Sequence, residues 1–205
     1  MTSLPLFPLP ALILYPGALV PLHLFEPRYR RLMRDLLDAG GREMVMGSLL
    51  PGWKDDQFGL PPVAEVAGLG RVVEVREDAE GCFDILLQGL SRVRLVEETM
   101  STPPPGELPY RRVAVETLEE ETLASEEAPG VHAALLEQLS RLAEELPREL
   151  LSADVNCLTD LLLVHAPLGL EERLDLFAEL NPRARAERLL LAMESRQAAG
   201  GVATD

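Results

Sequence analysis

Cysteine is scarce in this sequence, with only Cys82 and Cys157 among 205 residues. The two lie far apart and form no Cys-x-x-Cys pair, so neither a zinc site nor a redox motif is predicted. Each stands next to an apolar residue, where a reduced cysteine acts as a small hydrophobic side chain. The acidic residues show no calcium-loop spacing either, so no metal site is expected.

Lysine is scarcer still, because Lys54 is the only one. A Ser-Lys dyad would have to use it, and the nearest serine in sequence is Ser48. Ser91 is predicted on a strand rather than at a nucleophile elbow. The three histidines each fit a strand or helix pattern, and the phosphate-binding motif G-x-x-x-x-G-K-[ST] is missing. We therefore expect no catalytic residues, no cofactor and no enzymatic activity.

Positive charge and long apolar runs are lacking as well. The formal net charge of −15 opposes binding to nucleic acids and to anionic lipid surfaces. The one basic cluster, at residues 28–34, scatters over the outward face of a predicted helix and is interpreted as a solvated surface. No apolar run is long enough to cross a bilayer, and no signal peptide is recognisable at the N-terminus. We expect a soluble cytoplasmic protein.

What the chain does have is 47% hydrophobic residues and 17 prolines, enough apolar surface for a stable core. Its first part is rich in strand patterns. Residues 11–14 and 18–25 predict two strands, and Pro27 predicts the start of a helix that ends before Gly40. Further strands are predicted at residues 44–50, 63–77, 82–88, 93–96 and 113–115. Gly68 and Gly70 fit a barrel corner.

After residue 118 the pattern changes from strand to helix. An acidic run at residues 116–127 is interpreted as a solvated linker or helix start. Apolar residues then repeat at helical spacing in four stretches, and Asn181 with Pro182 predicts the start of the last helix. The predicted fold class is α+β: a small β-barrel or bent antiparallel sheet with one helix in residues 1–118, followed by an α-helical bundle in residues 119–205.

Several stretches resemble the substrate-binding domain of Lon proteases. Prolines separate short apolar runs from Leu4 to Tyr29, and this stretch is similar to the opening of that domain. Residues 68–75, 87–95, 108–116 and 166–173 follow in the same order as similar stretches there. The resemblance implies a PUA-like β-barrel and a helical subdomain. Because the phosphate-binding motif is missing, the chain resembles a stand-alone relative without the ATPase and peptidase domains.

The resemblance also implies a function, which is recognition of other polypeptides. The implied partners are unfolded or degron-bearing polypeptides. A further implied role is that of an adaptor in protein quality control, whose partner would be a separate protease or chaperone. The alternative is an RNA-associated module, since PUA-like barrels also occur in RNA-binding proteins. A binder of small molecules in a barrel pocket is a third possibility, but the sequence supplies no convergent polar set for it.

Two groups of residues are candidates for a polypeptide-binding surface. The first is Trp53, Phe58 and Leu60, in a loop at residues 51–62 that is rich in Gly, Pro and Asp. This loop could instead fold back onto the barrel and cover its core. The second group is Phe25, Arg28 and Tyr29. Its alternative role is architectural, with the two rings holding the junction between strand and helix.

Overall fold

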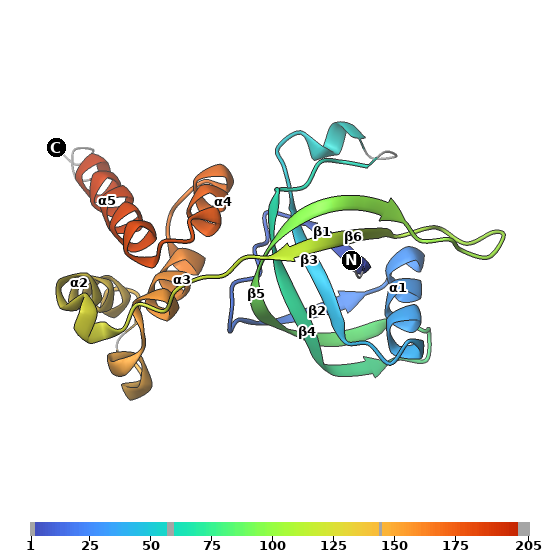
Figure 1. The fold of residues 1–205 in the computed structure, drawn as a ribbon, viewed down its shortest axis with the longest axis horizontal. Helices are drawn as coiled ribbons and strands as arrows, with labels where there is room; N and C mark the ends of the chain where they lie inside the picture. The colour runs from blue at the N-terminus through green and yellow to red at the C-terminus, as the bar shows by residue number, and fades with distance from the viewer. Residues whose placement is uncertain (1–2, 57–59, 144, 201–205) are drawn as a thin grey trace. The chain divides into compact units, whose positions relative to one another are not determined.

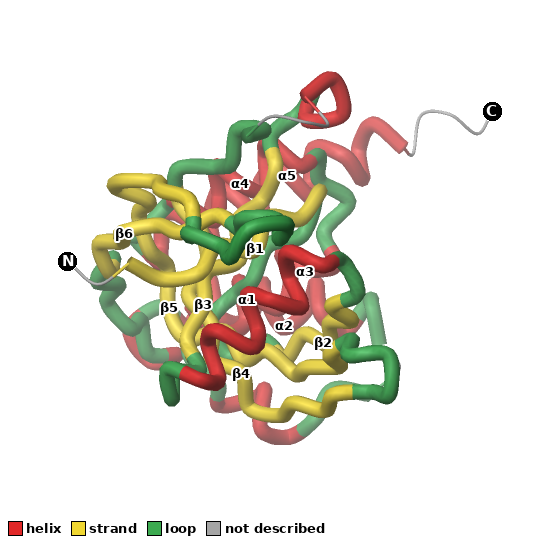
Figure 2. The backbone as a smooth tube through the Cα atoms, turned by 90° about the vertical axis from the view of Figure 1, so that its right-hand side faces the viewer, coloured by secondary structure: helices red, strands yellow, loops and turns green. Residues whose placement is uncertain are grey.

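The computed structural model describes residues 3–56, 60–143 and 145–200, and the chain divides into two compact units, Met1–Leu118 and Glu119–Asp205 (Figures 1 and 2). The first unit holds the strands. Its elements are β1 (Ser3–Pro10), β2 (Leu19–Leu24), α1 (Pro27–Asp38), β3 (Glu43–Leu49), a 3-10 turn (Trp53–Asp56), β4 (Val66–Glu77), β5 (Phe83–Met100) and β6 (Arg111–Thr117).

The strands form one sheet in the order β2-β5-β4-β3-β1-β6, and β5 also pairs with β6. Five strands thereby close into a ring, while β2 stays outside it on β5 (Figure 1). The α+β class and the bent, barrel-like sheet are confirmed, although the ring with its extra strand is not a clean barrel. The β1–β3 pair is parallel, so the sheet is mixed and the prediction of an antiparallel sheet is wrong at this pair. A parallel pair needs a long crossover, which β2 and α1 provide here.

Three of the predicted strands differ clearly from those in the structure. The first strand is Ser3–Pro10, whereas residues 11–14 lie in a turn and an irregular segment. The three prolines of this strand disfavour a strand prediction, because proline cannot donate a backbone hydrogen bond. Leu6 and Phe7 are nevertheless buried, and the strand pairs with β3 and β6. Packing therefore overrides the local pattern. The strands predicted at 82–88 and 93–96 are one continuous strand, β5, which runs through Gly89.

The helix α1 completes the core of this unit. Pro27 occupies its first turn, and its buried face, formed by Leu32, Met33 and Leu36, packs into a cluster with residues of the surrounding strands. Arg30 ties the helix to the β4–β5 turn, because its Nε donates to the carbonyl of Gly81 at 2.7 Å. The inward side chains of β2 therefore pack into the same apolar cluster as α1.

The second unit is helical. Its elements are the 3-10 turns Ser125–Glu127 and Arg148–Ser152 and the helices α2 (Pro129–Ser140), α3 (Val155–His165), α4 (Leu170–Ala178) and α5 (Pro182–Gly200). Asn181 caps α5 as predicted, since its Oδ1 accepts from the amide of Ala184 at 2.9 Å. In this unit and in the rest of the described chain, none of the helices has the length and apolar character needed to span a membrane.

Candidate functional site

The strand β2 separates apolar side chains between two faces. Val20, Leu22 and Leu24 pack against the core of the first unit. The alternate residues, Leu19, Pro21 and His23, face outward because successive side chains of a strand point to opposite sides. Phe25 follows directly after the strand. Leu19 is 57% exposed and Phe25 is 62% exposed. We call Leu19, Pro21 and Phe25 the β2 surface.

A polar cluster holds the β2 surface at its Phe25 end. His23 Nδ1 lies 2.8 Å from Asp84 Oδ1, and Arg76 Nη2 donates to Asp84 Oδ2 at 2.7 Å. The Arg76 guanidinium, and then His23, hold the pKa of the Asp84 carboxyl below its usual value. The imidazole stacks on the Phe25 ring with 6.0 Å between centroids. This contact orients an exposed aromatic ring without burying it.

Arg28 and Tyr29, predicted to act with Phe25, lie in a different setting. The Tyr29 ring packs edge-on against Phe7 at 4.5 Å between centroids, and its burial raises the pKa of its hydroxyl. Arg28 Nε lies 3.3 Å from Glu26 Oε2, and its guanidinium lies 5.8 Å from the Tyr29 centroid. Tyr29 is part of α1 and packs against the core of the first unit. Phe25 is therefore the member of this group that exposes apolar surface to solvent.

The predicted loop group is divided by the structure. Trp53 is half-buried in the 3-10 turn Trp53–Asp56, with Lys54 Nζ 5.9 Å from its ring centroid. Phe58 lies outside the described residues. Leu60 is 53% exposed and borders a cavity of about 420 Å³. The cavity is lined by Leu60, Pro62, Val63, Glu98, Thr99, Met100 and Arg111, and we call it the Leu60 groove.

An ion pair fixes the floor of the Leu60 groove. Arg111 is buried, and its Nε and Nη2 donate to the two carboxylate oxygens of Glu98 at 2.5 and 2.6 Å. Its Nη1 donates to the carbonyl of Pro61 at 2.8 Å. The guanidinium therefore joins the end of the loop to the β5–β6 hairpin. Sequence reasoning missed Arg111, because a single arginine in a strand gives no sign of its distant partners.

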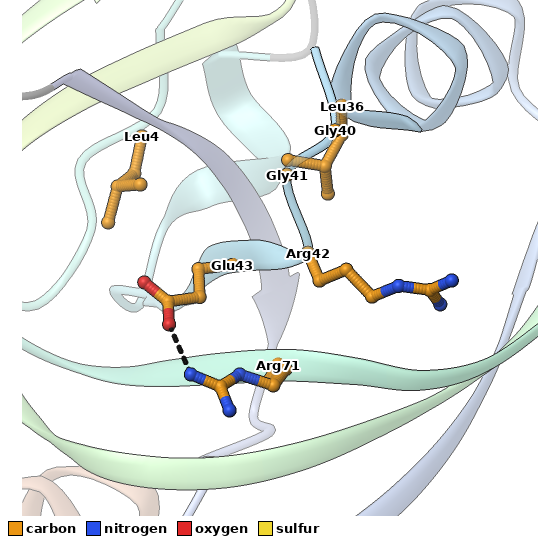
Figure 3. A pocket seen from close by; sticks show the side chains of 7 residues that line it. All are labelled: Leu4, Leu36, Gly40, Gly41, Arg42, Glu43 and Arg71. Carbon is orange, nitrogen blue, oxygen red and sulfur yellow. Dashed lines mark hydrogen bonds and ion pairs between the residues drawn. The ribbon is translucent and has the colours of Figure 1, made fainter. Parts of the chain in front are cut away.

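A second cavity, of about 520 Å³, lies where α1 ends (Figure 3). It is lined by Leu4, Leu36, Gly40, Gly41, Arg42, Glu43 and Arg71. Arg71 Nη2 donates to Glu43 Oε1 at 2.8 Å, so these two charges compensate each other. The Arg42 side chain extends away from the Glu43–Arg71 pair (Figure 3). The polar groups do not converge on one point, and within the described residues no cluster of potential metal ligands is found.

Comparison with known proteins decides the family. The substrate-binding domain of ATP-dependent protease La (LON) matches residues 3–195. The chain belongs to this family. Lon protease 2 of Sorangium cellulosum is 28% identical over 95% of this chain and 25% of its own length, and Lon protease 2 of Myxococcus xanthus is 25% identical over 91% and 23%. The chain thus spans about a quarter of the Lon proteases that it matches.

Solved structures agree with this assignment. The crystal structure of a Lon N-terminal domain protein from Xanthomonas campestris has a TM-score of 0.68 at 26% identity, covering 94% of this chain and 99% of that one. The N-terminal domain of the Mycobacterium avium complex Lon protease has a TM-score of 0.63 at 17% identity, covering 92% and 96% of the two chains, and supports the fold. The part of the Lon proteases that this chain matches is their substrate-binding domain.

Proposed function

We propose that this chain is a non-enzymatic cytoplasmic module that binds apolar segments of unfolded or degron-bearing polypeptides and acts as an adaptor in protein quality control. Membership of the Lon substrate-binding family supports a polypeptide ligand. The observation that carries the proposal is the β2 surface, where Leu19 and Phe25 are more than half exposed around Pro21. Leu19 and Phe25 lie about 20 Å apart along the strand, so an extended polypeptide segment that runs along β2 would contact both.

The β2 surface suits ligands of varied sequence. Burial of apolar area contributes about 25 cal/mol per Å² and does not depend on direction, so it places few demands on the identity of the ligand. The inward residues Val20, Leu22 and Leu24 anchor the strand in the core. A backbone that is already ordered loses little conformational entropy on binding. The surface is therefore prepared for side-chain contacts with many unfolded segments.

The RNA-associated alternative finds no comparable support. The arginines that could have formed a basic face make local contacts instead. Arg31 Nη1 donates to Glu107 at 2.5 Å, Arg34 Nη2 donates to Glu77 at 3.1 Å, and Arg30 binds backbone carbonyls. With a net charge of −15, and with Arg31 and Arg34 paired to carboxylates, the chain offers little attraction for a phosphate backbone.

Replacing Leu19 and Phe25 together by serine is expected to weaken binding of an unfolded polypeptide by about tenfold to a hundredfold. Full burial of such a side chain contributes about 1.5–3 kcal/mol, and roughly half of each is still exposed, so the pair contributes about 1.5–3 kcal/mol in total. A difference of 1.4 kcal/mol corresponds to a factor of ten in affinity. The measurement is fluorescence anisotropy with a labelled protein that has been reduced and alkylated so that it cannot refold. It is made at two salt concentrations, beside a labelled single-stranded RNA.

Leu108→Ser serves as the matched control, because Leu108 is 53% exposed but belongs to neither candidate surface. Its affinity and the melting temperatures of both variants should stay close to those of the original chain. Equal affinities for the double variant and the control would remove the β2 surface from the binding site. Salt-sensitive binding of RNA in place of the polypeptide would reject the proposed function.

A further inference from the structure

Among the residues that the structure describes, none pairs as a strand with one edge of β5 at residues 97–100. Its pairing with β4 ends at Val66 and Arg94, and the last contact along this side is the bond from the Leu95 amide to the carbonyl of Glu65, at 2.9 Å. Residues 97–100 of β5 pair with β6 on the other side. Residues 60–63 leave β5 at this point and approach β3, where Leu49 forms a bridge with Val63. The Leu60 groove lies in the gap.

The hydrogen-bonding direction of this edge follows from its register. The amide of Ser101 donates to the carbonyl of Tyr110 on the β6 side at 2.8 Å. Because direction alternates along a strand, residues 97 and 99 also bond toward β6, whereas the backbone groups of Glu98 and Met100 point into the Leu60 groove. Unpaired strand groups of this kind are a template for another extended chain.

The two sides of this edge differ in chemistry. On the groove side, the Met100 side chain lies with Leu60 and Val63, and Arg111 compensates the charge of Glu98. The opposite side of β5 carries Glu97, which is exposed and makes no ion pair within the described part of the chain. Arg94, on the same side, lies between two carboxylates, with Glu65 Oε1 at 3.0 Å and Glu116 Oε2 at 3.5 Å. Arg112, opposite Thr99 on this side, bonds to the backbone carbonyl of Ser3, so the three carboxylates exceed the two arginines by one negative charge.

We propose that an extended polypeptide segment with alternating apolar and basic side chains adds as a strand to β5 at residues 98–100. Its apolar side chains enter the Leu60 groove beside Leu60 and Met100, and its basic side chains lie near Glu97. Backbone bonds supply affinity and the alternating side chains supply selectivity, as in other strand additions. The proposal rests on the proposed function only in that the ligand is a polypeptide.

Strand addition distinguishes this edge from β2. Pro21 has no amide hydrogen, so the outer edge of β2 lacks a donor in the middle of the strand. The β2 surface therefore suits contacts between side chains, and the edge of β5 suits bonds to a ligand backbone. The first should accept many sequences, whereas the second selects segments that are extended and alternate in polarity.

The test uses the complete chain and fluorescein-labelled nine-residue peptides of alternating valine and lysine, or of valine and glutamate. We expect the valine–lysine peptide to bind at least about tenfold more tightly. Two further valine–lysine peptides carry N-methyl groups, one on the valine amides and the other on the lysine amides. Alternate amides of an added strand face β5, so methylation of one set should weaken binding about tenfold and methylation of the other set should not.

Protein variants complete the design. Glu97→Arg should reverse the preference between the lysine and glutamate peptides, and Asp38→Arg, which makes the same change in net charge at an exposed residue ending α1, should preserve it. The Leu19→Ser, Phe25→Ser double variant should bind the valine–lysine peptide unchanged, which separates this proposal from the proposed function. Equal effects of the two methylation patterns, or a preference that Glu97→Arg and Asp38→Arg alter alike, would overturn the proposal.

Discussion

Replacing Gly68 by alanine is expected to destabilise residues 1–118 by about 3 kcal/mol or more, which is a large part of the 5–15 kcal/mol typical of a folded domain. A Cβ atom at Gly68 would overlap the carbonyl oxygen of Leu14 and would lie 2.6 Å from its Cβ atom. Both atoms are fixed by the backbone, so no rotation of a side chain relieves the overlap. Gly89→Ala should behave in the same way, because its Cβ atom would overlap the carbonyl oxygen of Tyr15.

The measurement is urea unfolding followed by circular dichroism, with the fluorescence of Trp53 reporting on the first unit. Gly130→Ala is the matched control, since its Cβ atom would meet nothing within 4 Å at the start of α2. It should leave the fluorescence transition in place. Unchanged fluorescence midpoints for both Gly68→Ala and Gly89→Ala would show that residues 14–15 do not pass so closely over β4 and β5.

These glycines also show which part of the fold can be predicted from the sequence. Gly68 and Gly70 predict a corner from local pattern alone, because glycine in a strand often marks a bend or a close approach. The segment that approaches them, at residues 14–15, lies more than fifty residues earlier in the chain. Nothing in the local pattern of Leu14 indicates that contact. Sequence thus predicts the need for a small residue, while the fold determines which backbone lies against it.

For the candidate surfaces, too, local sequence patterns predict single residues but not the contacts between distant segments. The sequence places Phe25 and Leu60 next to strand ends and turns, and both are exposed in the structure. It does not predict the groove beside Leu60, because that groove requires β5 to continue past β4 and to pair with β6 alone. The buried Arg111 was missed for the same reason, since its partners Glu98 and Pro61 belong to other segments. Local patterns carry no register between distant strands.

Arg185→Leu is expected to cost the helical unit about 3–5 kcal/mol, because it removes a buried cation together with its ion pairs to Glu120 and Asp160. The Arg185 side chain is completely buried. Its Nη2 binds Glu120, its Nη1 donates to the carbonyl of Glu179 at 2.7 Å, and its Nε lies 3.6 Å from Asp160 Oδ1. The control Arg188→Leu removes an arginine that is half exposed on the same helix, and should cost less than about 1 kcal/mol.

A double-mutant cycle identifies the cause of that loss. If Arg185 mainly compensates buried charge, Arg185→Leu combined with Asp160→Leu should be less destabilising than the sum of the two single variants, because both single changes remove the same ion pair. Urea midpoints from circular dichroism supply the four free energies. Strict additivity would instead assign the effect of Arg185 to packing and to its bond with the Glu179 carbonyl. In either case the buried guanidinium joins the segment before α2 to α3 and α5.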